Sequence, residues 1–168
     1  QILDRQQHLA GDPAWRDGQR GIALSQKSRD QALAQSLLQR ALKRYPDDPK
    51  FLGYYALSLF QSARYDQAAI YFKKATMLED DPYFMTKWRT LHQDTLYWQE
   101  LRHADQALSR QQLDVAARLY TLAHQQRPDN INARLGMADT AIARRQLPRA
   151  IELLNAVRTL HPGDEGAL

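Results

Sequence analysis

The feature that most constrains the fold of this chain is an internal repeat. Four segments align on a small residue, a large apolar residue four positions later, and a small or branched residue three positions after that. The step from Ala34 to Ala68 recurs from Ala116 to Ala150, whereas the step between Ala68 and Ala116 is longer. A period of about 34 residues predicts a stack of small helical units, each leaving an apolar face that only a neighbour can cover. The aligned residues are Ala34, Leu38 and Ala41; Ala68, Phe72 and Ala75; Ala116, Tyr120 and Ala123; and Ala150, Leu154 and Val157.

The residue types at these positions favour pairs of antiparallel helices. Small side chains let neighbouring helices approach closely, the large residue fills the space between them, and proline ends a helix because it cannot continue one. The closing positions are Pro46, Asp80, Pro128 and Pro162. The pattern resembles the tetratricopeptide repeat (TPR) family, most specifically in the second helix of each unit. The resemblance implies an all-α, TPR-type α-solenoid, a right-handed superhelix of antiparallel helix pairs.

The same reading gives a helix map and a division of the chain. We expect a capping helix, or the end of a preceding repeat, over 1–12, two repeats over 13–80, an inserted or extended helix over 81–97, and two further repeats over 98–168. No stretch carries the alternation and turn signals of strands. The expected helices are 1–9, 13–27, 30–44, 48–61, 65–78, 83–110, 113–126, 130–143 and 147–160.

The longer step, between Ala68 and Ala116, contains a cluster of aromatic residues. Its extra residues fall between Asp81 and Trp98. Alternating steps of four and three predict one helical face there. Either a single helix of about 28 residues runs into the third repeat, or a short extra helix ends near Asp94. We expect this insertion to act as a bend or hinge, its tryptophans packing interrupted faces; ligand contact is the less favoured alternative. The hinge residues are Trp88, Leu91, Thr95 and Trp98.

Composition excludes several functions. The 168 residues contain no cysteine, which excludes disulfides and thiolate metal sites. The net charge of +4 is spread along the chain rather than gathered in a stripe, so we expect no nucleic-acid partner. No run is long and apolar enough for a membrane helix, and there is no signal-peptide pattern. Because the chain begins at Gln1 and stops after a helix-ending segment, it reads as a piece of a longer protein.

No catalytic or metal constellation is evident. The five histidines are scattered, and there is no phosphate-binding loop or nucleophile elbow. The acidic run Glu79 to Asp81 is interpreted as a solvated helix junction, because similar residues occupy the equivalent junctions at 46–49 and 128–130. The arginines near the fourth repeat are interpreted as a solvated face. We therefore predict a non-enzymatic protein without cofactor or metal.

The TPR resemblance implies that set positions of the first helices line a concave groove. Their mixture of polar and apolar residues suits an extended peptide or a helix. The register in the third unit depends on how the insertion folds. The groove candidates are Arg16, Gln19, Lys50, Leu57, Phe60, Gln61, Trp98, Leu101, Asp105, Asn132 and Asp139.

A finer resemblance concerns the order of three segments. "HLAGDPAWRDGQRGIAL" (8–24), "DDPYFMTKWRTLHQDTLYW" (80–98) and the stretch 113–154 are similar to the periplasmic TPR region of the cellulose synthase operon protein C family. Ala138 and Leu147 depart from that family, which often has glycine and tyrosine there. The resemblance implies a periplasmic scaffold, with its parent anchored at the outer membrane. Its partners would be proteins of a cellulose synthesis and export complex, with the glucan chain a further contact.

Two other functions stay open at this stage. One is a generic TPR peptide-binding adaptor or co-chaperone. The other is a polysaccharide-binding module of an export or processing protein, in which binding of cello-oligosaccharides would shift the fluorescence of Trp88 or Trp98.

Overall fold

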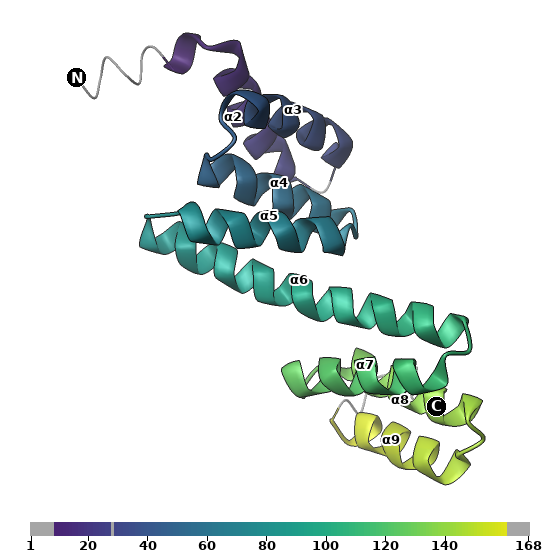
Figure 1. Cartoon of the computed structure of the whole chain (residues 1–168). Helices are drawn as coiled ribbons and strands as arrows, with labels where there is room; N and C mark the ends of the chain where they lie inside the picture. The colour runs from purple at the N-terminus through teal and green to yellow at the C-terminus, as the bar shows by residue number, and fades with distance from the viewer. Residues whose placement is uncertain (1–8, 28, 161–168) are drawn as a thin grey trace. The chain divides into compact units, whose positions relative to one another are not determined.

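The computed structural model describes residues 9–27 and 29–160, and this part of the chain contains helices and no strands (Figure 1). Every helix expected from residue 13 onward is present, with ends within two residues of the prediction. The all-α architecture of helix pairs is therefore confirmed. Residues 1–8 of the capping segment expected over 1–12 lie outside the described residues. The helices are α2 (Pro13–Ser25), α3 (Gln31–Arg44), α4 (Pro49–Gln61), α5 (Tyr65–Leu78), α6 (Pro82–Ser109), α7 (Leu113–Gln126), α8 (Ile131–Ala143) and α9 (Leu147–Leu160).

The chain divides into two compact units at the middle of α6, one ending at Leu96 and one beginning at Tyr97. The helices of the two units correspond residue by residue. The offset in residue number from the start of α3 at Gln31 to the start of α7 at Leu113 also relates both ends of α4 to α8 and of α5 to α9. Each residue from Gln31 to Leu78 therefore has a numbered equivalent between Leu113 and Leu160.

An aspartate followed by proline begins three of the first helices. Asp12, Asp48 and Asp81 precede α2, α4 and α6, and each carboxylate accepts a hydrogen bond from a backbone N–H of the first turn. Proline at the first helical position loses nothing, because its missing N–H would have no partner in the helix. Asn130 caps α8 in the same way. Acidic caps also suit the positive end of the helix dipole.

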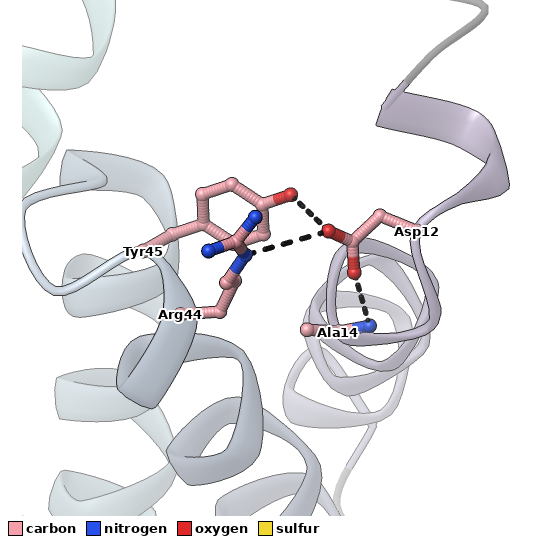
Figure 2. Close-up of polar contacts among 4 residues, drawn as sticks. All are labelled: Asp12, Ala14, Arg44 and Tyr45. Carbon is pink, nitrogen blue, oxygen red and sulfur yellow. Dashed lines mark hydrogen bonds and ion pairs between the residues drawn. The ribbon is translucent and has the colours of Figure 1, made fainter.

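The Asp12 cap also ties α2 to the end of α3 (Figure 2). The Tyr45 hydroxyl donates a hydrogen bond of 2.7 Å to the Asp12 carboxylate, and Arg44 lies 3.7 Å from the same oxygen. The hydrogen bond from Tyr45, then that from Ala14, holds the pKa of Asp12 below its ordinary value. One side chain therefore fixes both a helix start and a helix pair.

The tight turn inside a helix pair places a residue in the left-handed backbone region. Ala63, Gln111 and Arg145 have φ between 54° and 60° at equivalent positions. The following N–H reaches back five residues, as from Arg64 to the carbonyl of Leu59 at 2.9 Å. This is the hydrogen-bond pattern of a helix C-cap that usually carries glycine, so each side chain here is held against its steric preference.

The core of the first unit closes on Trp88, whose side chain is fully buried. Its ring lies 5.1 Å from Tyr54 and 6.2 Å from Phe72, measured between centroids. A Cβ at position 53 would overlap the indole, so glycine is required there for α6 to approach α4. The first half of α6 thus occupies the place where the first helix of another repeat would pack.

Glu79 corrects the sequence interpretation of the acidic run. Its side chain is only 5% exposed, whereas Asp80 is exposed as expected. The Glu79 carboxylate accepts hydrogen bonds from the Trp88 indole N–H at 3.3 Å and from the backbone N–H of Asp81 at 3.2 Å. The junction is solvated only in part, because a buried tryptophan needs an acceptor for its N–H.

The core of the second unit is built on tyrosines and alanines. Tyr97 and Tyr120 are almost completely buried, together with alanines of α6, α7 and α8. The Arg127 guanidinium lies 5.2 Å from the centre of the Tyr97 ring. A Cβ at position 136 would overlap the Tyr120 ring, which makes Gly136 the close-approach glycine of this unit.

Helix α6 is continuous over its 28 residues. Of the two alternatives open at the sequence level, the structure contains the single long helix. Its buried positions change along its length, from Trp88 and Thr95 in the first unit to Tyr97, Leu101 and Ala104 in the second. The division of the chain into named segments, and the action of α6 as a hinge, remain predictions.

Candidate interaction surface

The first helices of the first unit carry an unusual set of cations over aromatic rings. The Lys50 ammonium lies 4.7 Å from the centre of the Phe84 ring. The Lys87 ammonium lies 4.7 Å from the Tyr54 ring centre and 5.2 Å from that of Trp88, and it donates a hydrogen bond of 3.2 Å to the Tyr54 hydroxyl. We call Lys50, Tyr54, Phe84 and Lys87 the lysine–aromatic face.

The charge of this face is not neutralised within the described residues. Neither Lys50 nor Lys87 forms an ion pair with a carboxylate there. Ring faces hold the ammonium groups in place through cation–π attraction while leaving their charge unpaired. The arrangement can therefore attract an anionic group and offer apolar surface beside it.

Sequence reasoning found Lys50 and missed Lys87. The longer step between Ala68 and Ala116 assigns 81–97 to an insertion, which hides the regular step of the repeat that continues into it. One regular step beyond Lys50 and Gly53 lie Phe84 and Lys87, the two residues that α6 contributes to the lysine–aromatic face. The regular spacing therefore reaches Phe84 and Lys87, although the longer step between Ala68 and Ala116 hides it in the alignment of the second helices.

The other groove candidates of the first unit differ in accessibility. Arg16, Gln19 and Gln61 are exposed, whereas Leu57 and Phe60 are half-buried. Phe60 packs against the core, and its ring lies 5.5 Å from that of Tyr65. Its assignment to a binding groove stays a prediction, as do those of the other four.

In the second unit the groove candidates also differ in accessibility. Asp105, Asn132 and Asp139 are exposed, Trp98 is half-buried against the core, and Leu101 is only 5% exposed. Leu101 therefore has little side-chain surface left for a partner. Tyr97 is the aromatic residue of α6 that is fully buried in this core, whereas Trp98, assigned by the sequence to both the groove and the hinge, is half-buried against it.

The exposed acids of the second unit interact with each other. Burial, then the Asp105 charge, raises the pKa of Asp139. The Tyr120 hydroxyl donates a hydrogen bond to Asp105, and burial followed by this bond raises the pKa of Tyr120. At Asp105 and Asp139 the first helices of this unit thus carry carboxylates, whereas the lysine–aromatic face of the first unit carries ammonium groups.

The residues assigned to the insertion are packing residues to different degrees. Trp88 and Thr95 are fully buried, and the Thr95 hydroxyl donates a hydrogen bond of 2.7 Å to the carbonyl of Leu91. Leu91 is half-buried and packs against the core of the first unit. The interpretation of Trp88 as a ligand-contacting residue is wrong, because none of its surface is accessible.

Groups that could perform chemistry do not converge in the described part of the chain. No three histidine or acidic side chains there are placed to share a metal ion. Burial lowers the pKa of His92, with Lys73 adding to the effect, and lowers that of His124, with Arg134 adding. Among the described helices, none combines the length and apolar character required to cross a membrane.

Comparison with known proteins agrees with this architecture. Two family models described as "Tetratricopeptide repeat" match residues 22–83 and residues 107–167. This chain is a tetratricopeptide repeat protein. Repeats of this kind are protein-interaction modules and are typically not enzymes. The finer resemblance to the cellulose synthase operon protein C family receives no support from these matches.

Two solved structures show a distant similarity to this chain. MamA from Desulfovibrio magneticus has a TM-score of 0.48 and 16% identity, over 90% of this chain and 79% of that one. A TPR protein from Thermus thermophilus has a TM-score of 0.43 and 16% identity, over 92% of this chain and 94% of that one. We draw no functional inference from similarity at this level. No significant match was found among curated proteins.

Proposed function

We propose that this TPR protein is a protein-binding adaptor that holds an acidic segment of its partner on the lysine–aromatic face. The observation that carries the proposal is the pair Lys50 and Lys87, held over aromatic rings without a carboxylate partner among the described residues. An extended peptide or a helix offers carboxylates at spacings that two ammonium groups can meet. The half-buried Phe84 ring supplies apolar contact beside the two charges, and aromatic side chains are enriched among the residues that contribute most to binding.

Charge complementarity here would also set the rate of association. Unpaired surface cations raise the encounter rate with an acidic partner, and the effect weakens with salt. The acidic surface at Asp105 and Asp139 would repel the same segment from the second unit. The two units would then receive different parts of a partner or different partners.

The direct test is a selection with an array of random dodecapeptides on the whole chain. We expect enrichment of Asp and Glu next to apolar residues. The double variant Lys50→Gln/Lys87→Gln should bind the selected peptides about tenfold more weakly. Lys87→Arg keeps the charge and should keep the binding.

The matched control changes the same charge elsewhere. Lys27→Gln/Lys73→Gln alters two exposed lysines outside the lysine–aromatic face and should bind as the parent does. Selected peptides without acidic residues, or equal binding by both double variants, would contradict the proposal.

The specific cellular role that we propose is a scaffold of a periplasmic cellulose synthesis and export complex. It is supported by the order of the three sequence segments alone. The informative observation is the complete gene, where a secretion signal upstream and an outer-membrane segment downstream are expected. A pull-down of the complex's proteins by the full-length array provides the biochemical test, and failure to retain them would leave the generic adaptor role as the better assignment.

Contact with a polysaccharide is the remaining alternative and has its own readout. Because Trp88 is buried, any stacking on glucan would fall to half-buried Trp98. Titration with cello-oligosaccharides should then change the fluorescence of the parent chain but not that of Trp98→Phe. A flat titration of the parent chain would argue against sugar contact.

A further inference from the structure

A cavity of about 610 Å³ lies between α3 and α5, apart from the lysine–aromatic face. Its floor is formed by Leu52 and Tyr55 of α4, both nearly fully buried, and by Tyr71 of α5. The two tyrosine rings meet edge to face with their centres 4.8 Å apart. The volume is in the range of sites that hold small ligands or several side chains, roughly 300–1,000 Å³.

Three cations surround this floor. Arg40 and Lys43 project from α3 and Lys74 from α5, and all three are exposed. Arg40 lies 3.5 Å from Asp17 and Lys74 lies 3.0 Å from Asp47, whereas Lys43 has no carboxylate partner among the described residues. The Tyr55 hydroxyl accepts a hydrogen bond of 2.6 Å from the Gln39 amide and can still donate its own proton.

The second unit shows that this chemistry is not required by the fold. A smaller cavity of about 180 Å³ lies between α7 and α9, and its lining includes Met137 and Leu153, the equivalents of Tyr55 and Tyr71. The equivalents of the three cations are Leu122, Gln125 and Ala156. Two arginines line that smaller cavity elsewhere, and each is paired with a carboxylate: Arg144 with Asp114, and Arg149 with Glu152.

We propose that the cavity between α3 and α5 is a second binding site, which takes an apolar side chain flanked by carboxylates from a partner protein. The apolar side chain would lie on Leu52, Tyr55 and Tyr71. An adjacent carboxylate would pair with Lys43, and the Tyr55 hydroxyl would donate to a second acceptor. The adaptor, whose protein-binding role this inference rests on, would thus contact its partner on first and second helices of the same unit.

The test uses the ¹⁵N-labelled whole chain and a blocked peptide, acetyl-Ser-Glu-Phe-Glu-Ser-amide. We expect saturable shifts of the backbone amides in 36–45 and 71–74. Lys43→Gln, which installs the residue that the second unit has, should weaken binding roughly threefold, and Lys43→Gln/Lys74→Ala about tenfold. Lys73→Gln carries the same charge change outside the cavity and should leave the affinity unchanged.

Three further arms decide between alternatives. Peptides with glutamine for glutamate or alanine for phenylalanine should bind at least threefold more weakly, and equal binding by either would overturn the proposal. Shifts confined to the lysine–aromatic face would also overturn it. The variant Lys50→Gln/Lys87→Gln removes the charges of that face, so any binding that it keeps is assigned to the cavity between α3 and α5. An oligogalacturonate that binds where the peptide does not would assign the cavity to an anionic saccharide and refute the peptide site.

Discussion

The two units of this protein have equivalent helices, but different residues occupy equivalent positions in their cores. In the first unit Trp15, Tyr45 and Phe51 form an aromatic cluster with ring centres 5.0–6.1 Å apart. Their equivalents in the second unit are Tyr97, Arg127 and Ala133. There the cluster becomes a buried tyrosine with a guanidinium over its ring.

The comparison of the two units shows which positions require a particular type of residue. The buried alanines of the second helices are kept, as at Ala34 and Ala116, because they set how closely helices approach. Large residues vary in kind provided that the space is filled, which agrees with the tolerance of cores for changes that conserve packing. The surface varies most freely: Lys50 corresponds to Asn132 and Leu57 to Asp139. One scaffold therefore presents two unlike surfaces.

The largest expected effect comes from Trp88→Ala, which empties the core of the first unit and leaves Glu79 without the indole. We expect a loss of about 3–5 kcal/mol in the free energy of unfolding. Hydrogen exchange of α4 and α5 amides reads the first unit, and that of α7 and α8 reads the second. Trp98→Ala, at a half-buried position, should cost less than half as much. Equal loss of protection in both units after Trp88→Ala would show that they unfold as one.

The next effect tests the close helix approach in each unit. Gly53→Ala and Gly136→Ala place a methyl group against Trp88 and Tyr120, and each should lower the free energy of unfolding by about 1–3 kcal/mol. Gly11→Ala meets open space and is the control. Urea denaturation measures all three. A tolerated substitution at only one site would show that the two units differ in how tightly they pack.

A smaller effect, of opposite sign, is expected at the shared turn. Ala63→Gly and Gln111→Gly relieve a left-handed residue in the first and second unit, and each should raise the free energy of unfolding by roughly 0.5–1 kcal/mol. Gln112→Gly is the control, because its φ of −83° suits any residue. Stabilisation by Gly at 112 but not at 111 would contradict the turn assignment.

The smallest effects concern pH and have opposite signs in the two units. Because the pKa of Asp12 is lowered in the folded state, ionised Asp12 contributes to the free energy of unfolding. This contribution is present above pH 3.8, the ordinary pKa of aspartate, and is lost as the pH falls through the lowered pKa. The raised pKa of Asp139 means that stability falls as pH rises from 3.8 through the raised value. Asp12→Asn should therefore destabilise at neutral pH, and Asp139→Asn should stabilise slightly. Carboxyl titration by NMR gives both pKa values, and shifts of the same sign would remove this contrast.

The sequence predicts the helices well and the identity of buried residues less well. Helix positions follow from small residues and prolines that recur at fixed steps, so the second helices of both units, α3, α5, α7 and α9, could be located closely. Glu79 could not be recognised as buried, because its partner Trp88 comes from the next helix and the acidic run suggested solvent. Choosing Tyr97 over Trp98 required the phase of α6 after the irregular step, which spacing alone left open.

For the candidate surfaces, too, the sequence predicts positions along a helix but not contacts between helices. Lys50 was found because its position in a first helix is set by the repeat. Lys87 and the cavity beneath Lys43 depend on which elements meet in space, and the cations of the cavity come from two helices of different repeats. Sequence spacing places residues on a helix; it does not state which helix faces them.

The constant offset in residue number between the two units has a practical consequence for engineering. Residues 31–78 and 113–160 are blocks of equal length with the same helix ends and the same turn positions. Either block can replace the other without changing the positions at which helices and turns begin and end. Such chimeras would carry the cavity between α3 and α5, with Lys43 and Lys74, in both units or in neither, while Phe84, Lys87 and Asp105 of α6 stay in place. They would therefore separate binding at the cavity from binding at the lysine–aromatic face.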